Sequence, residues 1–521
     1  MADTNTIDIL TQRSSGVLLP IFSLPGPHAI GDIGKPAMHF IDFLHQAGQR
    51  YWQILPSGPT EPAFANSPYM SPSAFAGNPL FISTDALLAD GLLENHDNET
   101  IDTSEYIVDY PKALQLKQSL LHKAWQRFIT NNRQDTLDDF SSRHPWVKDY
   151  SLFQVLKKRY ANAPWFQWPE TIKKRDPETL GNIRREYASS LSYHIFEQYL
   201  FFRQWEKLRK YARQRDVRLI GDLPIYVAAD SADVWANQTI FQLDPRTSQP
   251  TSVAGVPPDY FSDTGQHWGN PLYRWQTTNQ KTKSTLWDWW AARFRHNFLL
   301  TDVLRIDHFR GFESYWSIPA EEETAINGKW IKGPGLPFFK DMEKKIGKLP
   351  IIAEDLGIIT PAVEKLRTDL GFPGMRILMF AFDGDTDNTY LPQNYDNNTV
   401  VYTGTHDNDT AVGWYLNPTV PVEDKQRAKR YANQSDMEAG VFHKDLLYMA
   451  HSSVANVAIV PMQDLLGFGN DCRVNTPGTI EGNWQWRCAS RFITQELADW
   501  LKEHTITFGR MVATEQKVEQ T

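Results

Sequence analysis

Residues 301–312, with the sequence TDVLRIDHFRGF, combine an apolar first half with charged groups in the second half. A buried parallel strand whose carboxyl end opens into a site has this pattern. Arg305 and Asp307 are two positions apart, so both side chains leave the same face of a strand. The arginine is expected to lower the pKa of the aspartate and keep it ionised, which suits a nucleophile. The alternative is that the two residues form only a structural salt bridge.

Eight short runs rich in β-branched residues recur along the chain, and helical patterns lie between most of them. The runs cover residues 16–24, 51–56, 217–226, 301–312, 349–357, 374–382, 399–407 and 457–465, and the helical patterns include residues 36–48, 361–370, 424–449 and 490–504. Alternation of this kind predicts an α/β fold, namely a (β/α)8 TIM barrel with parallel strands.

Two long intervals interrupt the alternation. Residues 85–216 are strongly helical, and residues 230–297 are rich in Pro, Gly and aromatic residues. We interpret both as insertions at the C-terminal face of the strands, where the functional loops of this fold lie. The alternative is that they only extend the scaffold. Residues 1–521 are therefore expected to form a single catalytic barrel, with a helical insertion after strand 2 and an aromatic, Pro-rich insertion after strand 3.

The composition excludes several classes of protein. The 521-residue chain has a formal net charge of −9 and no basic stripe, which argues against a nucleic-acid partner. Its first residues lack the basic start and apolar run of a signal peptide, and no apolar segment approaches the roughly 18 residues of a membrane span. We therefore expect a cytoplasmic protein with no membrane partner, and a monomer or weak homo-oligomer.

Metal and disulfide sites are not expected. The chain has two cysteines, Cys472 and Cys488, which are too few for a disulfide framework and lack metal-ligand spacing. Residues 383–388, DGDTDN, resemble the start of a calcium-binding loop, but Asn388 and Asn394 stand where such a loop has Gly and Glu. We interpret this segment as a solvated turn, and we expect neither a metal nor a cofactor.

Four of the expected strands end in acidic residues. These are Asp222, Asp307, Glu354 (followed by Asp355) and Asp407 (preceded by His406). Because the carboxyl ends of barrel strands converge on one pocket, the acids are expected to share it, and like charges at short range raise at least one pKa. A site with one ionised and one neutral carboxyl group suits cleavage of a glycosidic bond, in which one group attacks the sugar and the other protonates the leaving oxygen.

Several of these strand ends resemble those of a known group of enzymes. The segments LRIDHFRG, IIAEDLG and GTHDNDT are similar to the catalytic strand ends of the α-amylase clan. Together with GDLPIYV, AGVPPDYFSDTGQHWGNPLYRW and NTPGTIEGNWQWR, they most closely resemble the amylomaltases, the 4-α-glucanotransferase or disproportionating-enzyme family. The similarity extends over about residues 16–487, with the motifs in the family's order.

The resemblance implies a role for each matching residue. Asp307 would be the nucleophile, Glu354 the acid/base, and Asp407 the group that stabilises the distorted sugar. Arg305, His406 and Asp222 would complete the set of residues around the sugar. The implied substrates are α-1,4-glucans and maltooligosaccharides, cleaved with retention and transferred to the 4-OH of glucose or of another maltooligosaccharide.

Residues 254–268 are interpreted as a lid that excludes water from the reaction. Gly255 offers backbone freedom, and Pro257 and Pro258 stiffen the next turn. Aromatic rings that could stack on sugars come from this segment and from the loop after the second strand. They are Tyr260, Phe261, Trp268 and, from the other side of the pocket, Tyr69. The alternative is a loop that packs permanently against the barrel.

Two histidines and two rival functions remain to be distinguished. His406 is interpreted as a donor to a sugar hydroxyl rather than a core histidine, and the role of His308 is left open. A hydrolase of the same clan would share the first chemical step, and a catalytically inactive carbohydrate-binding scaffold would share the pocket. The products formed from maltotriose, glucose against total reducing ends, distinguish these functions.

Overall fold

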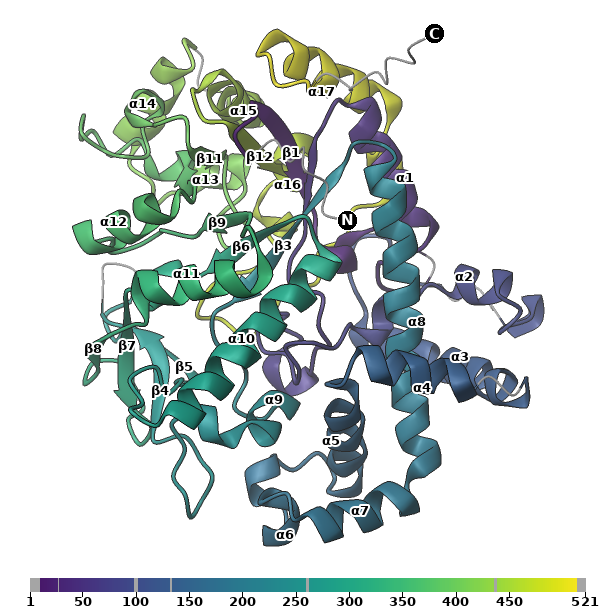
Figure 1. Cartoon of the computed structure of the whole chain (residues 1–521). Coiled ribbons are helices and arrows are strands. Elements are labelled where there is room, and N and C mark those ends of the chain that lie inside the picture. Colours follow the sequence, from purple (N-terminus) through teal and green to yellow (C-terminus); the bar gives the residue numbers. More distant parts are fainter. Residues whose placement is uncertain are drawn as a thin grey trace, which may run out of the picture.

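In this computed structural model, which describes residues 10–26, 28–97, 102–131, 134–258, 262–434 and 438–512, parallel strands close into a barrel (Figure 1). They are β1 (Ser14–Leu18), β2 (Tyr51–Gln53), β3 (Arg218–Pro224), β6 (Val303–Asp307), β9 (Ile351–Ala353), β10 (Gly374–Ile377), β11 (Thr399–Tyr402) and β12 (Val457–Pro461). Each strand pairs with the next one in this order, and β12 closes the ring on β1. The prediction of a (β/α)8 barrel is confirmed, since every expected run contains or overlaps one of these strands.

Helices surround the barrel on the outside (Figure 1). Those that follow a barrel strand or lead into the next one are α1 (Lys35–Gln46), α8 (Ala188–Arg213), α10 (Gln280–Leu300), α11 (Gly335–Ile346), α12 (Pro361–Leu370), α13 (Ala411–Leu416), α14 (Val422–Tyr431), α15 (Phe442–Ser452), α16 (Met462–Leu466) and α17 (Gln495–Thr507). The pattern at residues 424–449 corresponds to two helices, α14 and α15, rather than one. Among the described residues, no helix has both the length and the apolar stretch needed to cross a bilayer.

The segment expected to be a helical insertion, residues 85–216, lies between β2 and β3. It carries most of α2 (Thr84–Ala89), then α3 (Tyr110–Thr130), α4 (Gln134–Arg143), α5 (Val147–Arg159), α6 (Glu170–Lys173) and α7 (Pro177–Glu186), and ends with α8. In Figure 1 these helices gather at the lower right, beside the barrel. The long helix α8 contacts both this helical segment and the barrel. It packs against α4 and α5 on one side and against α1 and β3 on the other.

A second sheet, which the sequence patterns did not predict, lies beside the barrel at the lower left of Figure 1. Its antiparallel strands are β4 (Ser252–Val256), β5 (Gln266–Pro271), β7 (Ser314–Pro319) and β8 (Lys329–Lys332), in the order β5-β4-β7-β8. Residues 230–297 therefore contain α9 (Ala232–Ala236), β4, β5 and most of α10. Gly255 lies inside β4, where an added Cβ would be 2.1 Å from the carbonyl oxygen of Gln266. Gly255 therefore allows close packing between β4 and β5.

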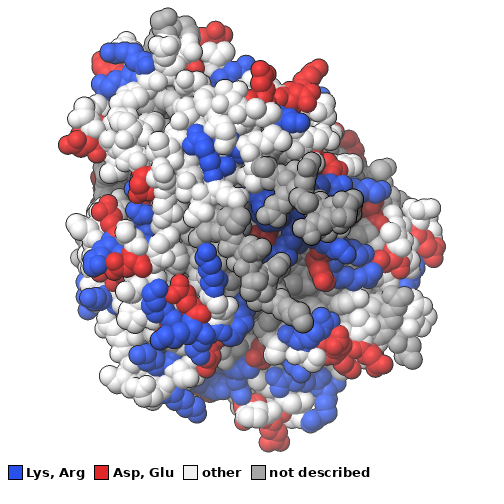
Figure 2. Space-filling model, turned by 45° about the horizontal axis from the view of Figure 1, so that its top comes forward, with Lys and Arg blue, Asp and Glu red and all other residues white. Residues whose placement is uncertain are grey.

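The barrel interior is tightly filled beneath the site. Leu18, Ile220, Val303 and other apolar side chains of the strands are fully buried there. The Tyr402 hydroxyl donates to Oε1 of Gln53 across the barrel, at 2.9 Å. Basic and acidic side chains are interspersed on the face of the molecule seen in Figure 2.

Candidate active site

The carboxyl ends of four barrel strands bring acidic groups to one end of the barrel. Asp222 lies in β3, Asp307 ends β6, Glu354 directly follows β9, and Asp407 follows β11 by five residues. Asp307, Glu354 and Asp407 line the same cavity, while the Asp222 side chain is buried beneath them. The structure therefore brings the four predicted acids together.

Asp222 and Arg305 are neighbours because the register of β3 and β6 places them side by side. Nη1 of Arg305 donates to both carboxylate oxygens of Asp222, at 2.8 and 2.7 Å. Nη2 of the same guanidinium lies 3.1 Å from Oδ1 of Asp307. The expected pair of Arg305 and Asp307 exists, but Asp222 shares the arginine's positive charge.

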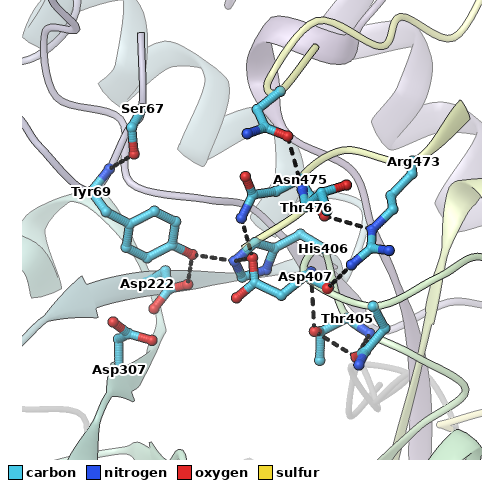
Figure 3. A network of polar contacts seen from close by, with 12 residues as sticks. Ser67, Tyr69, Asp222, Asp307, Thr405, His406, Asp407, Arg473, Asn475 and Thr476 are labelled. Carbon is cyan, nitrogen blue, oxygen red and sulfur yellow. Dashed lines mark hydrogen bonds and ion pairs between the residues drawn. The ribbon is translucent and has the colours of Figure 1, made fainter. Parts of the chain in front are cut away.

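The Tyr69 hydroxyl joins two of the predicted residues (Figure 3). It donates to Oδ2 of Asp222 at 2.7 Å and lies 2.8 Å from Nε2 of His406. The two rings are stacked, with centroids 5.4 Å apart and an interplanar angle of 12°. Since the hydroxyl proton points to Asp222, Tyr69 can accept a hydrogen bond from a neutral His406 protonated at Nε2. Burial lowers the pKa of His406, which favours this neutral form.

Asp407 is held by residues that sequence reasoning missed. Nδ2 of Asn475 donates to Oδ1 of Asp407 at 2.7 Å, and Nη2 of Arg473 donates to the Asp407 carbonyl at 2.5 Å (Figure 3). Nε2 of His406 lies 3.3 Å from Oδ1 of Asp407, and 43% of the Asp407 side chain is exposed. The position of Asn475 at the start of the NTPGTIEGNWQWR motif was the available signal.

Two backbone amides fix the Glu354 carboxylate. Its Oε2 accepts from the His308 N–H at 2.7 Å, and its Oε1 accepts from the Leu356 N–H at 2.8 Å. His308 is left-handed, with φ 56°, and this backbone conformation belongs to the turn that directs its N–H to Glu354. Burial raises the pKa of Glu354, while Arg305 and the two amides oppose the rise.

Asp355, the acid next to Glu354, does not join the cluster. Its Oδ1 accepts from the Met375 N–H at 2.7 Å, and its Oδ2 forms ion pairs with Arg367 and Arg376. A Cβ at Gly374 would lie 2.4 Å from Oδ2 of Asp355, so this position requires glycine. The Asp355 carboxylate is therefore part of the scaffold behind Glu354.

The protonation of Asp307 differs from the sequence-based expectation. Burial raises the pKa of Asp307 to about 8; Arg305 opposes the rise, whereas Asp222, Glu354 and Asp407 add to it. Arg305 does not dominate because its charge is shared with Asp222. Burial raises the pKa values of both Asp307 and Glu354.

The aromatic residues of the expected lid are only partly described. Trp268 lies in β5, where its Nε1 donates to Oε1 of Gln266 at 3.1 Å. Its ring meets the His308 ring edge-on, with centroids 4.9 Å apart. Tyr260 and Phe261 lie outside the described residues. The role of residues 254–268 as a moving lid stays a prediction.

The acids stand in the middle of a cleft with two arms. The first, which we call the β8 arm, has a volume of about 1090 Å³ and includes Pro257, Arg310 and Trp330 in its wall. The second, which we call the Tyr69 arm, has a volume of about 650 Å³ and includes Tyr69 and Trp484. Both arms share Asp307, Glu354, Asp407, His308 and Trp268 in their lining. A glucan bound at the acids could thus contact wall residues of either arm.

A parallel barrel with several carboxyl groups at its strand ends, open to a two-armed cleft, has the architecture of an enzyme that cleaves glycosidic bonds. Within the described residues, no three His, Cys, Asp or Glu side chains are grouped as metal ligands would be.

Comparison with known proteins identifies the family. Residues 19–494 match the family described as 4-alpha-glucanotransferase. A 4-alpha-glucanotransferase of Synechocystis sp. is 47% identical over 515 residues, which cover 97% of this chain and 99% of that protein. One from Clostridium butyricum is 44% identical and covers 94% and 99%. The amylomaltase from Streptococcus agalactiae, solved in complex with acarbose, has a TM-score of 0.91 at 39% identity and covers 96% of this chain and 100% of that one.

The chain belongs to the 4-alpha-glucanotransferase, or amylomaltase, family. The predicted family is confirmed, and so is the predicted 4-alpha-glucanotransferase activity, because the similarity to enzymes of that activity extends over nearly the whole chain.

Proposed function

We propose that this enzyme transfers segments of α-1,4-glucans between maltooligosaccharides through a covalent intermediate on Asp307. In the first step, an Asp307 oxygen bonds to the anomeric carbon, the glycosidic bond breaks, and Glu354 gives its proton to the leaving oxygen. In the second step, Glu354 takes the proton from the 4-OH of an acceptor, which displaces Asp307. Two inversions at the anomeric carbon leave the α configuration retained.

The position of Asp307 and Glu354 in one cavity, at the carboxyl ends of the neighbouring strands β6 and β9, carries this proposal. The two steps need one ionised and one protonated carboxyl group, and two buried carboxyl groups in one cavity, both with raised pKa values, favour a state in which only one of them is ionised. Glu354 is held by two amides in a fixed orientation, while Arg305 anchors one oxygen of Asp307. The Streptococcus agalactiae amylomaltase was solved with acarbose bound, which supports a saccharide ligand for the cleft of this chain.

The remaining residues of the cluster would bind the sugar that becomes attached to Asp307. Asp407, oriented by Asn475, would accept hydrogen bonds from sugar hydroxyls that strengthen as the ring flattens. Tyr69 and His406 would close the same side of the pocket, and Asp222 would hold Arg305 and Tyr69 in place. In this arrangement the neutral His406 donates its Nε2 proton to the Tyr69 hydroxyl and lies beside Asp407.

Hydrolysis is the alternative fate of the same intermediate. Water is present at about 55 M, and an acceptor competes with it only when the cleft holds the acceptor in place, which can supply an effective molarity of about 10⁵ M or more. The two-armed cleft supports transfer because it offers binding surface beyond the acids in each arm. Residues 254–268 and Tyr69 would exclude water.

Product analysis tests the proposed function. The enzyme is incubated with maltotriose, and released glucose and total reducing ends are measured together over time. A transferase releases glucose and longer oligosaccharides while total reducing ends stay constant. A rise in reducing ends equal to the number of bonds cleaved would show a hydrolase. The cytoplasmic location, the monomeric or weakly oligomeric state and the status of residues 85–216 and 230–297 as insertions stay predictions.

A further inference from the structure

Trp330 is a large aromatic residue that remains exposed inside the catalytic cleft. It lies in β8, the edge strand of the small sheet, and 38% of its surface is exposed. It lines the β8 arm, the same cavity that holds Asp307, Glu354 and Asp407. An exposed tryptophan in a concave site is a candidate contact surface for a ligand.

Two neighbours hold the Trp330 ring in one orientation. The guanidinium carbon of Arg310 lies over the ring, 3.8 Å from its centroid. Trp316, directly opposite in β7, meets the ring at 65° with centroids 5.1 Å apart. Arg310 is itself buried and is fixed by a hydrogen bond from its Nη1 to the carbonyl oxygen of Ile358. A ring fixed in this way loses little conformational freedom when a ligand binds.

The same contacts tie Trp330 to the loops that carry the reacting acids. Arg310 follows Asp307 by three residues, and Ile358 follows Glu354 by four. The ring is therefore positioned from the loops after β6 and β9, and not from the side of Tyr69 and His406. In the proposed mechanism the leaving glucan, and later the acceptor, lie on the Glu354 side, because Glu354 exchanges a proton with their 4-oxygen.

We propose that Trp330 is a stacking platform for a glucosyl unit of the acceptor, beyond the unit that contacts Glu354. The proposal rests on the proposed function and deepens it, because it assigns a residue to the choice of acceptor length. The apolar face of a glucose ring covers the open face of the indole, and Arg310 supports the opposite face. Glucose as an acceptor is too short to reach this platform, whereas maltooligosaccharides extend over it.

The test uses a fixed activated donor, 4′-deoxy-α-maltosyl fluoride, whose non-reducing unit lacks the 4-OH that an acceptor needs. The acceptors are glucose, maltose, maltotriose and maltotetraose, and the KM of each acceptor is measured for the native enzyme, Trp330→Ala and Trp330→Phe. For Trp330→Ala, the ratio of the maltotetraose KM to the glucose KM should rise about tenfold, the equivalent of about 1.4 kcal/mol. For Trp330→Phe, which keeps an aromatic face, the rise should be about threefold or less.

Tyr106→Ala is the matched control. Tyr106 has the same exposed fraction as Trp330, 38%, and also lies beneath an arginine, Arg491, whose guanidinium carbon is 5.1 Å from the ring centroid. Among the described residues that line the two arms, Tyr106 is absent. Its replacement should leave the KM ratio unchanged.

Three results would overturn the proposal. The first is a proportional rise of KM for glucose and maltotetraose in Trp330→Ala. The second is an equal rise in Trp330→Ala and Trp330→Phe, which would mean that only packing had changed. The third is an effect that follows the length of the fluoride donor, which would place Trp330 on the donor side. Failure of the proposed function itself is seen separately, as the absence of fluoride release and transfer in the native enzyme.

Discussion

Nη1 of Arg305 donates to both carboxylate oxygens of Asp222, at 2.8 and 2.7 Å, across two neighbouring barrel strands. Both side chains are almost completely buried, so each depends on the other for its charge balance. The arrangement also limits how much of the Arg305 charge acts on Asp307. Burial raises the pKa of Asp307, nearby acids add to the rise, and the shared Arg305 opposes it only in part.

Removal of Asp222 should destabilise the protein. Asp222→Ala leaves the buried Arg305 with one ion-pair partner, Asp307, and breaking a buried pair costs about 3–5 kcal/mol. For a chain of this size the corresponding fall in Tm is about 3–5 °C, measured by thermal unfolding. Tyr69→Phe, which removes one hydrogen bond to Asp222 and leaves its ion pair with Arg305 intact, is the milder control. An unchanged Tm in Asp222→Ala would mean that the pair contributes nothing to stability.

Asp307 should reduce stability at alkaline pH. Its pKa in the folded enzyme is raised from 3.8 to about 8, so between these values the folded state binds more protons than the unfolded state. The native enzyme therefore loses stability as the pH rises from about 4 to about 8. Asp307→Asn has no carboxyl group to ionise at this position, so it does not lose stability in this way. Its Tm should exceed that of the native enzyme by about 2–4 °C at pH 8.5, with a smaller difference at pH 5. A difference that shrinks as the pH rises would contradict the raised pKa.

Glu354 should matter most for donors with poor leaving groups. Glu354→Gln cannot protonate the leaving oxygen of maltotriose, so turnover on this donor should fall by about 10²–10⁴-fold. A glycosyl fluoride scarcely needs a proton, and turnover on it should fall much less. Asp355→Asn is the matched control, because Asp355 is adjacent in sequence but bonded to Arg367 and Arg376 away from the cleft. Equal losses of turnover on maltotriose and on the glycosyl fluoride in Glu354→Gln would show that Glu354 is not the general acid.

Asp407 should act mainly in the transition state. If its hydrogen bonds to the sugar strengthen as the ring flattens, Asp407→Asn should lower kcat by orders of magnitude and change KM much less. Asn475→Ala, which removes the 2.7 Å hydrogen bond that orients Asp407, should show the same pattern at about a tenfold loss of kcat. Steady-state kinetics on maltotriose measure both. An effect confined to KM would show that Asp407 only positions the substrate.

Much of the barrel could be predicted because its signals are local. Each strand is a short apolar, β-branched run, and the acids at four strand ends follow in sequence directly or within a few residues. The small sheet lacked such signals. β4 contains Gly255, and β5 and β7 end in proline. β4 pairs with β7 although α10 and β6 lie between them in the sequence. Its pairing is set by tertiary structure, so strand propensity alone does not reveal it.

The sequence predicted which residues form the candidate site, but it predicted the electrostatic interactions between them less well. Asp307, Glu354 and Asp407 were found from their motifs, whereas Asn475 contacts Asp407 from 68 residues away. Likewise Asp222 and Arg305 are 83 residues apart, and their contact depends on the register of β3 and β6. A pairing of Arg305 with Asp307 alone would lower the pKa of Asp307. The raised value arises because burial and three further acids act together, which only the folded chain shows.

The central claim, that Asp307 is the nucleophile, is tested most directly by trapping the intermediate. A fluorinated glycosyl fluoride is incubated with the enzyme, and tryptic peptides are measured by mass spectrometry. Cleavage after Arg305 and Arg310 yields the peptide of residues 306–310, in which Asp307 is the only side-chain carboxylate. We expect the mass of one fluorinated glycosyl group on this peptide, and no label in Asp307→Asn. A label on another peptide, or near-normal transferase activity in Asp307→Asn, would contradict the mechanism.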